Sequence, residues 1–309
     1  MASILAFRKA ATATACAAVL GMVSPMASAA LTINTINTTV GIGATLAGAV
    51  QASSSGINVV SGSETYQGTN TANIQQSGTY SGFNLAPSSG STPTLSMADG
   101  IFLTSGNANI PLTNTVNAFS GGPGSGSSAL LGALNATQGG TSVTNDANVL
   151  SFDFTVASGI NAVTAKFIFG TDEFPTQSVT DIFGFFVDGV NFAKFPNGQL
   201  IANTPSNPTN FILNPVGSGL YGIEYNGLTN EFTITAALNS ALSTHTITIG
   251  IADTSDTIYD SGVFVNSLAA TTTTGGCTGI GCNNNVPEPG SLALLALGML
   301  GLYRSRRRA

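Results

Sequence analysis

Acidic side chains gather in three short segments of this chain, and they are the residues best suited to chemistry. They are Asp172, Glu173, Asp181, Asp253, Asp256 and Asp260. Lys166 is the only basic residue near them in sequence, so the carboxylates would repel one another if the fold brought them together. A hard cation such as Ca²⁺ relieves such repulsion, because it takes carboxylate and carbonyl oxygens as ligands.

The same residues have a plainer explanation as turn caps. The spacing from Asp253 to Asp260 does not match an EF-hand loop. Aspartate often accepts backbone N–H bonds in the loops of β-proteins. We therefore favour turn capping over a calcium site, and both over catalysis. Calcium is the one cofactor that the sequence suggests.

The sequence supports a hydrolase less well than it supports calcium binding or turn capping. A Ser-His-Asp arrangement must use His245, the only histidine, and no G-x-S-x-G elbow is present. The serines from Ser125 to Ser128 belong to a glycine-rich loop that we expect to be flexible. A carboxylate pair for glycoside cleavage, for example Glu173 with Asp256, is conceivable because two acids suffice. We expect the chain not to be an enzyme.

Period-two alternation of apolar residues defines the elements that must hold these side chains. It marks strands at 149–156, 162–169, 231–238 and 244–251. Ile182–Val187 is apolar on both faces and is predicted to be a central strand. The earlier stretch from Leu31 to about Ser96 favours edge or surface strands with polar loops, or partial disorder. The pattern predicts an all-β fold, an antiparallel, jelly-roll-like β-sandwich.

Charge and cysteine content exclude some functions. Between residues 30 and 286, two lysines stand against thirteen acidic residues, a net charge of −11. Nucleic acid is therefore not an expected partner, because binding it needs a basic surface. Cys277 and Cys282 are predicted to form a local disulfide in an oxidising compartment, and without a nearby histidine they make a poor zinc site.

Both ends of the chain carry targeting features. Arg8 and Lys9 precede an apolar stretch, and Ala27–Ala29 supplies small residues for signal peptidase, so residues 1–29 are predicted to be a signal peptide. The triplet Pro287, Glu288 and Pro289 leads into an apolar run. A basic stop follows, made of Arg304, Arg306, Arg307 and Arg308.

The C-terminal apolar run is short for a permanent anchor. As a helix, Gly290–Tyr303 covers about 21 Å, against roughly 30 Å of hydrocarbon. The order of triplet, apolar helix and arginines resembles the PEP-CTERM sorting signal of Gram-negative bacteria. That resemblance implies transient anchoring by a short transmembrane helix in the inner membrane, then cleavage by an exosortase and transfer to the cell surface.

The strand motifs resemble the choice-of-anchor L domain. They are Gly100–Gly106, Asp146–Phe154, Phe167–Pro175, Asp181–Val187 and Ile251–Val265. Thr171–Pro175 departs from the commoner Ser-Glu-Glu-Tyr-Pro form but keeps the carboxylates in kind. The resemblance implies a domain of bacterial surface proteins with interchangeable anchors, and it carries no firm activity.

Together these features predict four segments. They are a signal peptide (1–29), a choice-of-anchor L-like domain (30–270), a Thr/Gly/Asn-rich spacer (271–286) and a sorting segment (287–309). We expect an exported, non-enzymatic component of the biofilm matrix or envelope, processed by signal peptidase and exosortase, with extracellular polysaccharide as a partner. The alternative is a surface domain that binds or cleaves carbohydrate, with Tyr66, Tyr80 and Tyr225 stacking on sugars. For these tyrosines we prefer ordinary packing.

Overall fold

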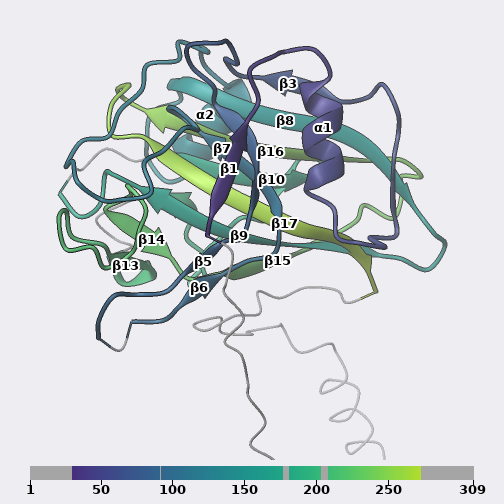
Figure 1. Ribbon diagram of the computed structural model, residues 1–309. Helices are drawn as coiled ribbons and strands as arrows, with labels where there is room; N and C mark the ends of the chain where they lie inside the picture. Colours follow the sequence, from purple (N-terminus) through teal and green to yellow (C-terminus); the bar gives the residue numbers. More distant parts are fainter. Residues whose placement is uncertain (1–29, 91, 177–180, 203–207, 273–309) are drawn as a thin grey trace, which may run out of the picture.

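The computed structural model describes residues 30–90, 92–176, 181–202 and 208–272, which form two facing sheets with antiparallel pairing (Figure 1). The eight-stranded sheet has the order β1 (Thr32–Thr35), β4 (Ser77–Ser81), β7 (Gly100–Thr104), β17 (Ser261–Thr271), β9 (Ala162–Thr171), β14 (Gly227–Thr229), β13 (Phe211–Leu213), with β15 (Phe232–Ala237) also on β9. The seven-stranded sheet has the order β11 (Val190–Asn191), β10 (Ile182–Val187), β16 (His245–Thr254), β8 (Thr144–Val156), β2 (Ile57–Val59), with β12 (Ile201–Ala202) on β10 and β3 (Thr65–Gln67) on β8. A small hairpin joins β5 (Asn84–Leu85) to β6 (Leu95–Ser96), and a 3₁₀ turn spans Pro208–Asn210.

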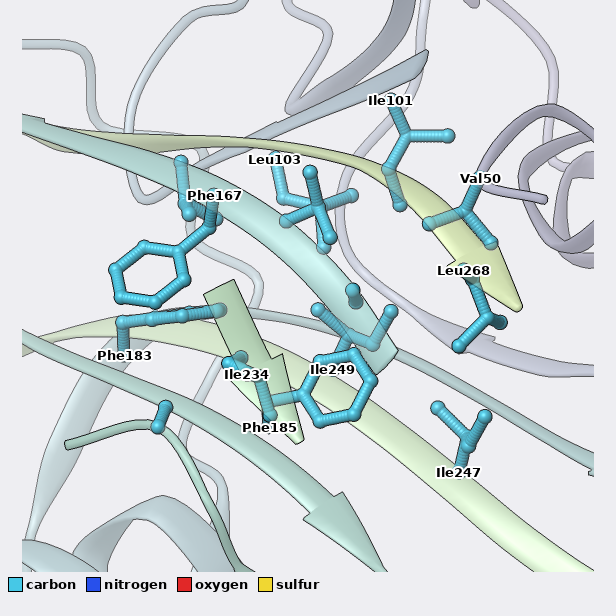
Figure 2. Close-up of a cluster of buried hydrophobic side chains, with 14 of the residues drawn as sticks. Val50, Ile101, Leu103, Phe167, Phe183, Phe185, Ile234, Ile247, Ile249 and Leu268 are labelled. Atoms are coloured by element: carbon cyan, nitrogen blue, oxygen red, sulfur yellow. The ribbon is translucent and has the colours of Figure 1, made fainter. Parts of the chain in front are cut away.

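The core lies between the sheets and is built from the alternating residues of their strands. Figure 2 shows Phe183 and Phe185 of β10 in one cluster with Phe167 of β9. The ring centroids of Phe167 and Phe183 are 5.2 Å apart. Ile247 and Ile249 of β16 belong to the same cluster and are fully buried. This packing confirms the all-β sandwich that the period-two pattern predicts.

The outer faces of both sheets are covered as well. On the eight-stranded sheet, Phe102 of β7 stacks on Phe264 of β17 with centroids 4.4 Å apart. On the seven-stranded sheet, Leu131 lies over Gly184 and Gly250, which pair across β10 and β16. A Cβ at either glycine would come within 3.2 Å of a Leu131 methyl group. Strand β10 is therefore buried on both faces, as its composition predicts.

Two helices escape prediction from the sequence. Helix α1 (Ile42–Ala49) and helix α2 (Ala129–Ala136) have eight residues each, little more than two turns. They are rich in alanine and glycine and carry no charged residues, so their helical periodicity is weak. Ser128 caps α2 by accepting the N–H of Leu131. Tertiary packing stabilises them: α1 lies against β8 (Figure 1) and buries Leu46 in the core.

The Thr- and Asn-rich stretch from Leu31 to about Ser96 contains strands β1 to β6 and helix α1. The sequence allowed either short edge or surface strands or partial disorder here, and the described residues of this stretch form short strands. Strands β1 and β2 lie at the ends of their sheets, where polar residues remain in contact with water.

Several predictions concern residues outside the described part of the chain. They are the signal peptide at 1–29, the disulfide between Cys277 and Cys282, the sorting motif with its basic stop, and the C-terminal transmembrane helix. No helix among the described residues has the length and apolar character needed to cross a membrane. The jelly-roll-like connection of the strands and the segment boundaries stay predictions.

Candidate functional site

The acidic residues meet at one end of the sandwich, where β9 and β16 finish and β10 and β17 begin. One position beyond the pair Ile182↔Ala252, Asp181 lies opposite Asp253 in the seven-stranded sheet. In the eight-stranded sheet, the N–H of Asp172 donates to the carbonyl oxygen of Asp260 at 3.2 Å. Like charges directly opposite each other destabilise a sheet. Each sheet thus places two carboxyl groups side by side at the same end.

Three of these residues, Asp181, Asp253 and Glu173, form an inner group that we call the inner acids. Asp181 has the same parity along its strand as Phe183, and Asp253 the same as Ile251, so both belong to the core-facing side. All three inner acids are completely buried. Their six carboxyl oxygens have no hydrogen-bond partner among the described residues.

Hydroxyl groups lie beside the inner acids without satisfying them. Ser261 is close enough to Asp181, and Ser105 to Asp253, to lower the pKa of each carboxyl slightly. The hydroxyl of Ser105 instead donates to the carbonyl oxygen of Ser261 at 3.4 Å, and the Oγ of Ser261 has no hydrogen-bond partner among the described residues. This end of the core between the sheets is therefore polar and rich in oxygen atoms.

Burial and mutual repulsion make ionisation of the inner acids costly. Burial, followed by the charges of Asp256 and Asp253, raises the pKa of Glu173 to about 8. Burial is also the main cause that raises the pKa of Asp253 to about 8. The pKa of Asp181 is raised well above its usual range by complete burial and by the neighbouring Asp253 and Glu173.

Basic groups do not compensate this charge. Lys166 and Lys194 are the only lysines in the described part of the chain, which contains no arginine. Lys166 binds Glu231, with Nζ 2.7 Å from a carboxylate oxygen. Neither lysine is among the groups that shift the pKa values of the inner acids.

Asp172 and Asp260, the outer acids, lie on the opposite face of the eight-stranded sheet and have backbone partners. Asp172 accepts the N–H of Phe119 at 2.6 Å and that of Asn226 at 3.0 Å. Asp260 accepts the N–H of Gly121 at 2.6 Å. Burial is the main cause that raises the pKa of Asp172 to about 7 and that of Asp260 to about 9. These two carboxyl groups thus hold the backbone of segments distant in sequence.

Asp256 lies at the rim of the cluster and is half-buried. Its carboxylate accepts the N–H of Ile258 at 3.2 Å, which is a local turn cap. Its charge is nevertheless the largest neighbouring charge acting on the pKa of Glu173. The six predicted residues thus come together at one end of the sandwich. The inner acids lack hydrogen-bond partners, the outer acids accept backbone N–H groups, and Asp256 caps a local turn.

Asp146 belongs to the same end of the sandwich and was missed by sequence reasoning. It is buried at the start of β8 with a positive φ of 48°. Burial raises the pKa of its carboxyl, and the backbone N–H groups of Gly124 and Ser125 lower it in part. Its place at the head of the Asp146–Phe154 motif is the one signal that could have drawn attention to it.

The glycine-rich segment Ser120–Ser128 ties these acids to the rest of the fold. Beyond the bonds to Asp260 and Asp146, Ser125 donates from its hydroxyl to the carbonyl oxygen of Ala147 at 2.8 Å. Ser120 accepts the N–H of Tyr259 at 2.8 Å. The segment Ser120–Ser128 thus supplies N–H and hydroxyl donors to the acidic end of the sandwich.

Among the described residues, no hydrogen bond joins His245 to a serine, as a serine-histidine triad would need. His245 lies at the opposite end of β16 from Asp253, about 26 Å away at roughly 3.3 Å per residue. Its Nδ1 is 2.8 Å from the carboxylate of Asp188, and both side chains are buried. Ser128 caps a helix beside Thr144, at the acidic end.

The tyrosines pack in the interior. Tyr80 is 2% exposed and Tyr225 is fully buried. Tyr66 is half-buried, and its hydroxyl lies 2.7 Å from that of Ser77. Ordinary packing, rather than sugar stacking, is thus the correct interpretation for Tyr80 and Tyr225.

In the ranges that the structure covers, no three His, Cys, Asp or Glu side chains form a group that could hold a metal ion. An ion among the inner acids would need further oxygen ligands, from hydroxyl groups, carbonyl groups or water. Ca²⁺ accepts such mixed sets of about six to eight oxygens.

The fold and its acidic end define a β-sandwich domain without a recognisable catalytic arrangement among the described residues. Comparison with protein families identifies it: the Choice-of-anchor L domain matches residues 35–270, so the chain belongs to that family. The PEP-CTERM protein-sorting motif matches residues 285–308, which marks an exported, envelope-sorted protein with the exosortase recognition signal. Both are sorting and structural domains rather than catalytic ones. No curated protein and no solved structure gives a significant match.

Proposed function

We propose that this chain is a non-enzymatic component of the extracellular polysaccharide matrix or outer envelope, released from a transient inner-membrane anchor by an exosortase. The observation that carries the proposal is the sorting motif at 285–308, placed directly after a family domain that ends at residue 270. Cleavage of such a tail would release the folded domain outside the inner membrane.

The surface chemistry of the domain agrees with such a role. Six of the thirteen acidic residues at 30–286 are not buried, against two lysines, so the surface carries a net negative charge, which favours solubility and opposes contact with nucleic acid. Ser, Thr and Asn dominate the loops and edge strands, and such side chains hydrogen-bond readily with a hydrated matrix.

Carbohydrate cleavage is the less favoured alternative. The charge of Asp256 acts on the pKa of Glu173, but Glu173 is completely buried and cannot reach a polysaccharide without rearrangement. A reducing-sugar assay and a glycan array on the full-length protein separate the two functions. A matrix component gives no sugar release, whereas a glycosidase does.

Cell fractionation tests the sorting step. In the producing bacterium, we expect the wild-type protein in the extracellular matrix, and a Pro287→Ala, Glu288→Ala, Pro289→Ala variant in the membrane fraction. An Asn283→Ala, Asn284→Ala variant, altered just before the motif, serves as the control and should follow the wild type. If the triplet variant reaches the matrix in wild-type amounts, sorting by this tail is wrong.

A further inference from the structure

A pocket, which we call the α1–β3 pocket, lies between the start of helix α1 and strand β3, two elements that are neighbours in the fold (Figure 1). Its volume is about 270 Å³. This corresponds to roughly nine water molecules at about 30 Å³ each, which is enough space for one sugar ring. One wall comes from residues between 39 and 44, and the other from Glu64, Tyr66 and Gly68.

Tyr66 offers its ring to this pocket, because its hydroxyl group is used elsewhere. The hydroxyl lies 2.7 Å from that of Ser77 and accepts a hydrogen bond from Nδ2 of Asn70 at 2.7 Å. Gly68 makes room for this arrangement, since a Cβ at that position would collide with the Tyr66 hydroxyl. The ring is therefore held in place and presents apolar surface to a ligand.

Hydrogen-bonding groups line the α1–β3 pocket on both sides. Glu64 contributes a carboxylate whose Oε2 accepts the N–H of Gly62 at 2.7 Å, while its Oε1 accepts no hydrogen bond from the described residues. Gly41 provides no side-chain cap for α1, and Thr45 is the first helical residue whose N–H is bonded. Residues 42–44 therefore line the pocket with N–H groups that lack an acceptor in the described part of the chain.

This mixture of groups favours a neutral ligand that carries several hydroxyl groups. An anion would be attracted by the start of α1 but repelled by Glu64, and a cation would meet the reverse. Hydroxyl groups both donate and accept hydrogen bonds, so those of a sugar can pair with Glu64 and with the helix N–H groups at once. The C–H groups of the same sugar can lie against the ring of Tyr66.

We propose that the α1–β3 pocket binds one neutral sugar unit of the extracellular polysaccharide, an inference that rests on the proposed place of the chain in the matrix. A wider groove of about 690 Å³ near Asp99 and Ser267 suits a sugar less well, because no aromatic side chain lines it. Binding in the α1–β3 pocket would attach the domain to the polysaccharide without cleaving it.

Saturation-transfer NMR on the full-length protein tests this inference, in a detergent that has no sugar headgroup. The probes are the methyl glycosides of glucose, galactose, mannose, rhamnose and N-acetylglucosamine. At least one should bind with a Kd of about 1–10 mM, and glucosamine and glucose 6-phosphate should each bind at least about tenfold more weakly. Absence of binding by all of these methyl glycosides at about 50 mM would overturn the proposal.

Ala44→Leu tests the location by filling the α1–β3 pocket. Ala44 is exposed and lines the pocket, so the larger side chain should occupy the space of the sugar and weaken binding at least about tenfold. Thr45→Leu is the matched control, because Thr45 is exposed on the same helix but does not line the pocket. It should keep the wild-type affinity, and equal losses in the two variants would contradict the location.

Two substitutions of Tyr66 separate the ring from the hydroxyl group. Tyr66→Leu and Tyr66→Phe both lose the hydrogen bonds with Ser77 and Asn70, so both share any loss of stability. Tyr66→Leu should weaken binding about tenfold, and Tyr66→Phe should restore most of that loss because it returns the ring. Equal affinities for these two variants would show that the ring is not part of the site.

Glu64→Gln should weaken binding about tenfold, because a charge-assisted hydrogen bond to the sugar becomes a neutral one. Asp99→Asn is the control, since Asp99 likewise accepts one backbone N–H, that of Gly82 at 3.3 Å. Loss of binding in Asp99→Asn alone would place the site in the wider groove and refute the assignment. None of these measurements depends on sorting. A protein that reaches the matrix but binds no neutral sugar would refute this inference alone, whereas one that binds sugar but stays in the membrane would refute the proposed function.

Discussion

Replacement of Gly106 by alanine tests how tightly the acidic end is built. A Cβ at this position would lie 1.6 Å from the Oδ2 of Asp260 and 2.0 Å from its Cγ. The same Oδ2 accepts the N–H of Gly121 at 2.6 Å, so the carboxyl group cannot move without loss of that hydrogen bond. Overpacking costs about 1–3 kcal/mol, and the lost hydrogen bond adds about 1 kcal/mol. We expect Gly106→Ala to lower the free energy of unfolding by about 2–4 kcal/mol, which lowers Tm by about 4–16 °C.

Gly122→Ala is the matched control, since it lies in the glycine-rich segment beside Gly121. A Cβ there meets nothing within 4 Å, and its φ is not in the left-handed region. Its unfolding free energy should stay within about 1 kcal/mol of the wild type, or rise, because alanine restricts the unfolded chain. Thermal unfolding by circular dichroism in EDTA gives both values. Equal Tm values for the two variants would refute the packing of Asp260 between β7 and this segment.

Two further substitutions probe the far end and the core. Burial alone would raise the pKa of Asp188, but hydrogen bonds from Asn239, His245 and Thr246 together lower it. The ionised carboxylate therefore stabilises the fold fully above the unfolded pKa, and this stabilisation is lost as pH falls through the lower folded pKa. In urea titrations, Asp188→Asn should therefore lower the free energy of unfolding by about 1.5–3 kcal/mol at pH 7, and by progressively less below about pH 4. A difference from the wild type that stays constant with pH would contradict the lowered pKa of Asp188. Ile249→Ala should cost about 2–5 kcal/mol in the same assay because it leaves a cavity in the core. Ile258→Ala, at a side chain 47% exposed, should cost little, and similar losses for the two isoleucines would count against the core described for β16.

Much of the fold follows from local pattern. The alternation in Val149–Val156 predicts most of β8, because one face of that strand packs in the core and the other does not. The doubly apolar run Ile182–Val187 predicts a strand covered on both sides, and α2 supplies the second cover. The helices themselves are too short and too poor in charge to show a period, so only their tertiary contacts reveal them.

The sequence predicts which acidic residues form the cluster, but not which of them find hydrogen-bond donors and which do not. Strand parity separates Asp181 and Asp253, aligned with core residues, from Asp172 and Asp260, aligned with the outer face. Parity cannot tell which carboxyl groups find donors, because those donors come from Phe119 and Gly121, more than fifty residues away in sequence from the acids they serve. Turn capping describes Asp256, the outer acids accept N–H groups from distant segments, and the inner acids have neither kind of partner.

The most direct test of the sorted, released product is the intact mass of the protein recovered from outside the cell. We predict a chain that lacks residues 1–29 and has lost the basic stop from Arg304 to Arg308, with the new C-terminus near Pro287–Pro289. A mature protein that retains Arg304 to Arg308 would contradict it and would indicate a permanent membrane anchor instead.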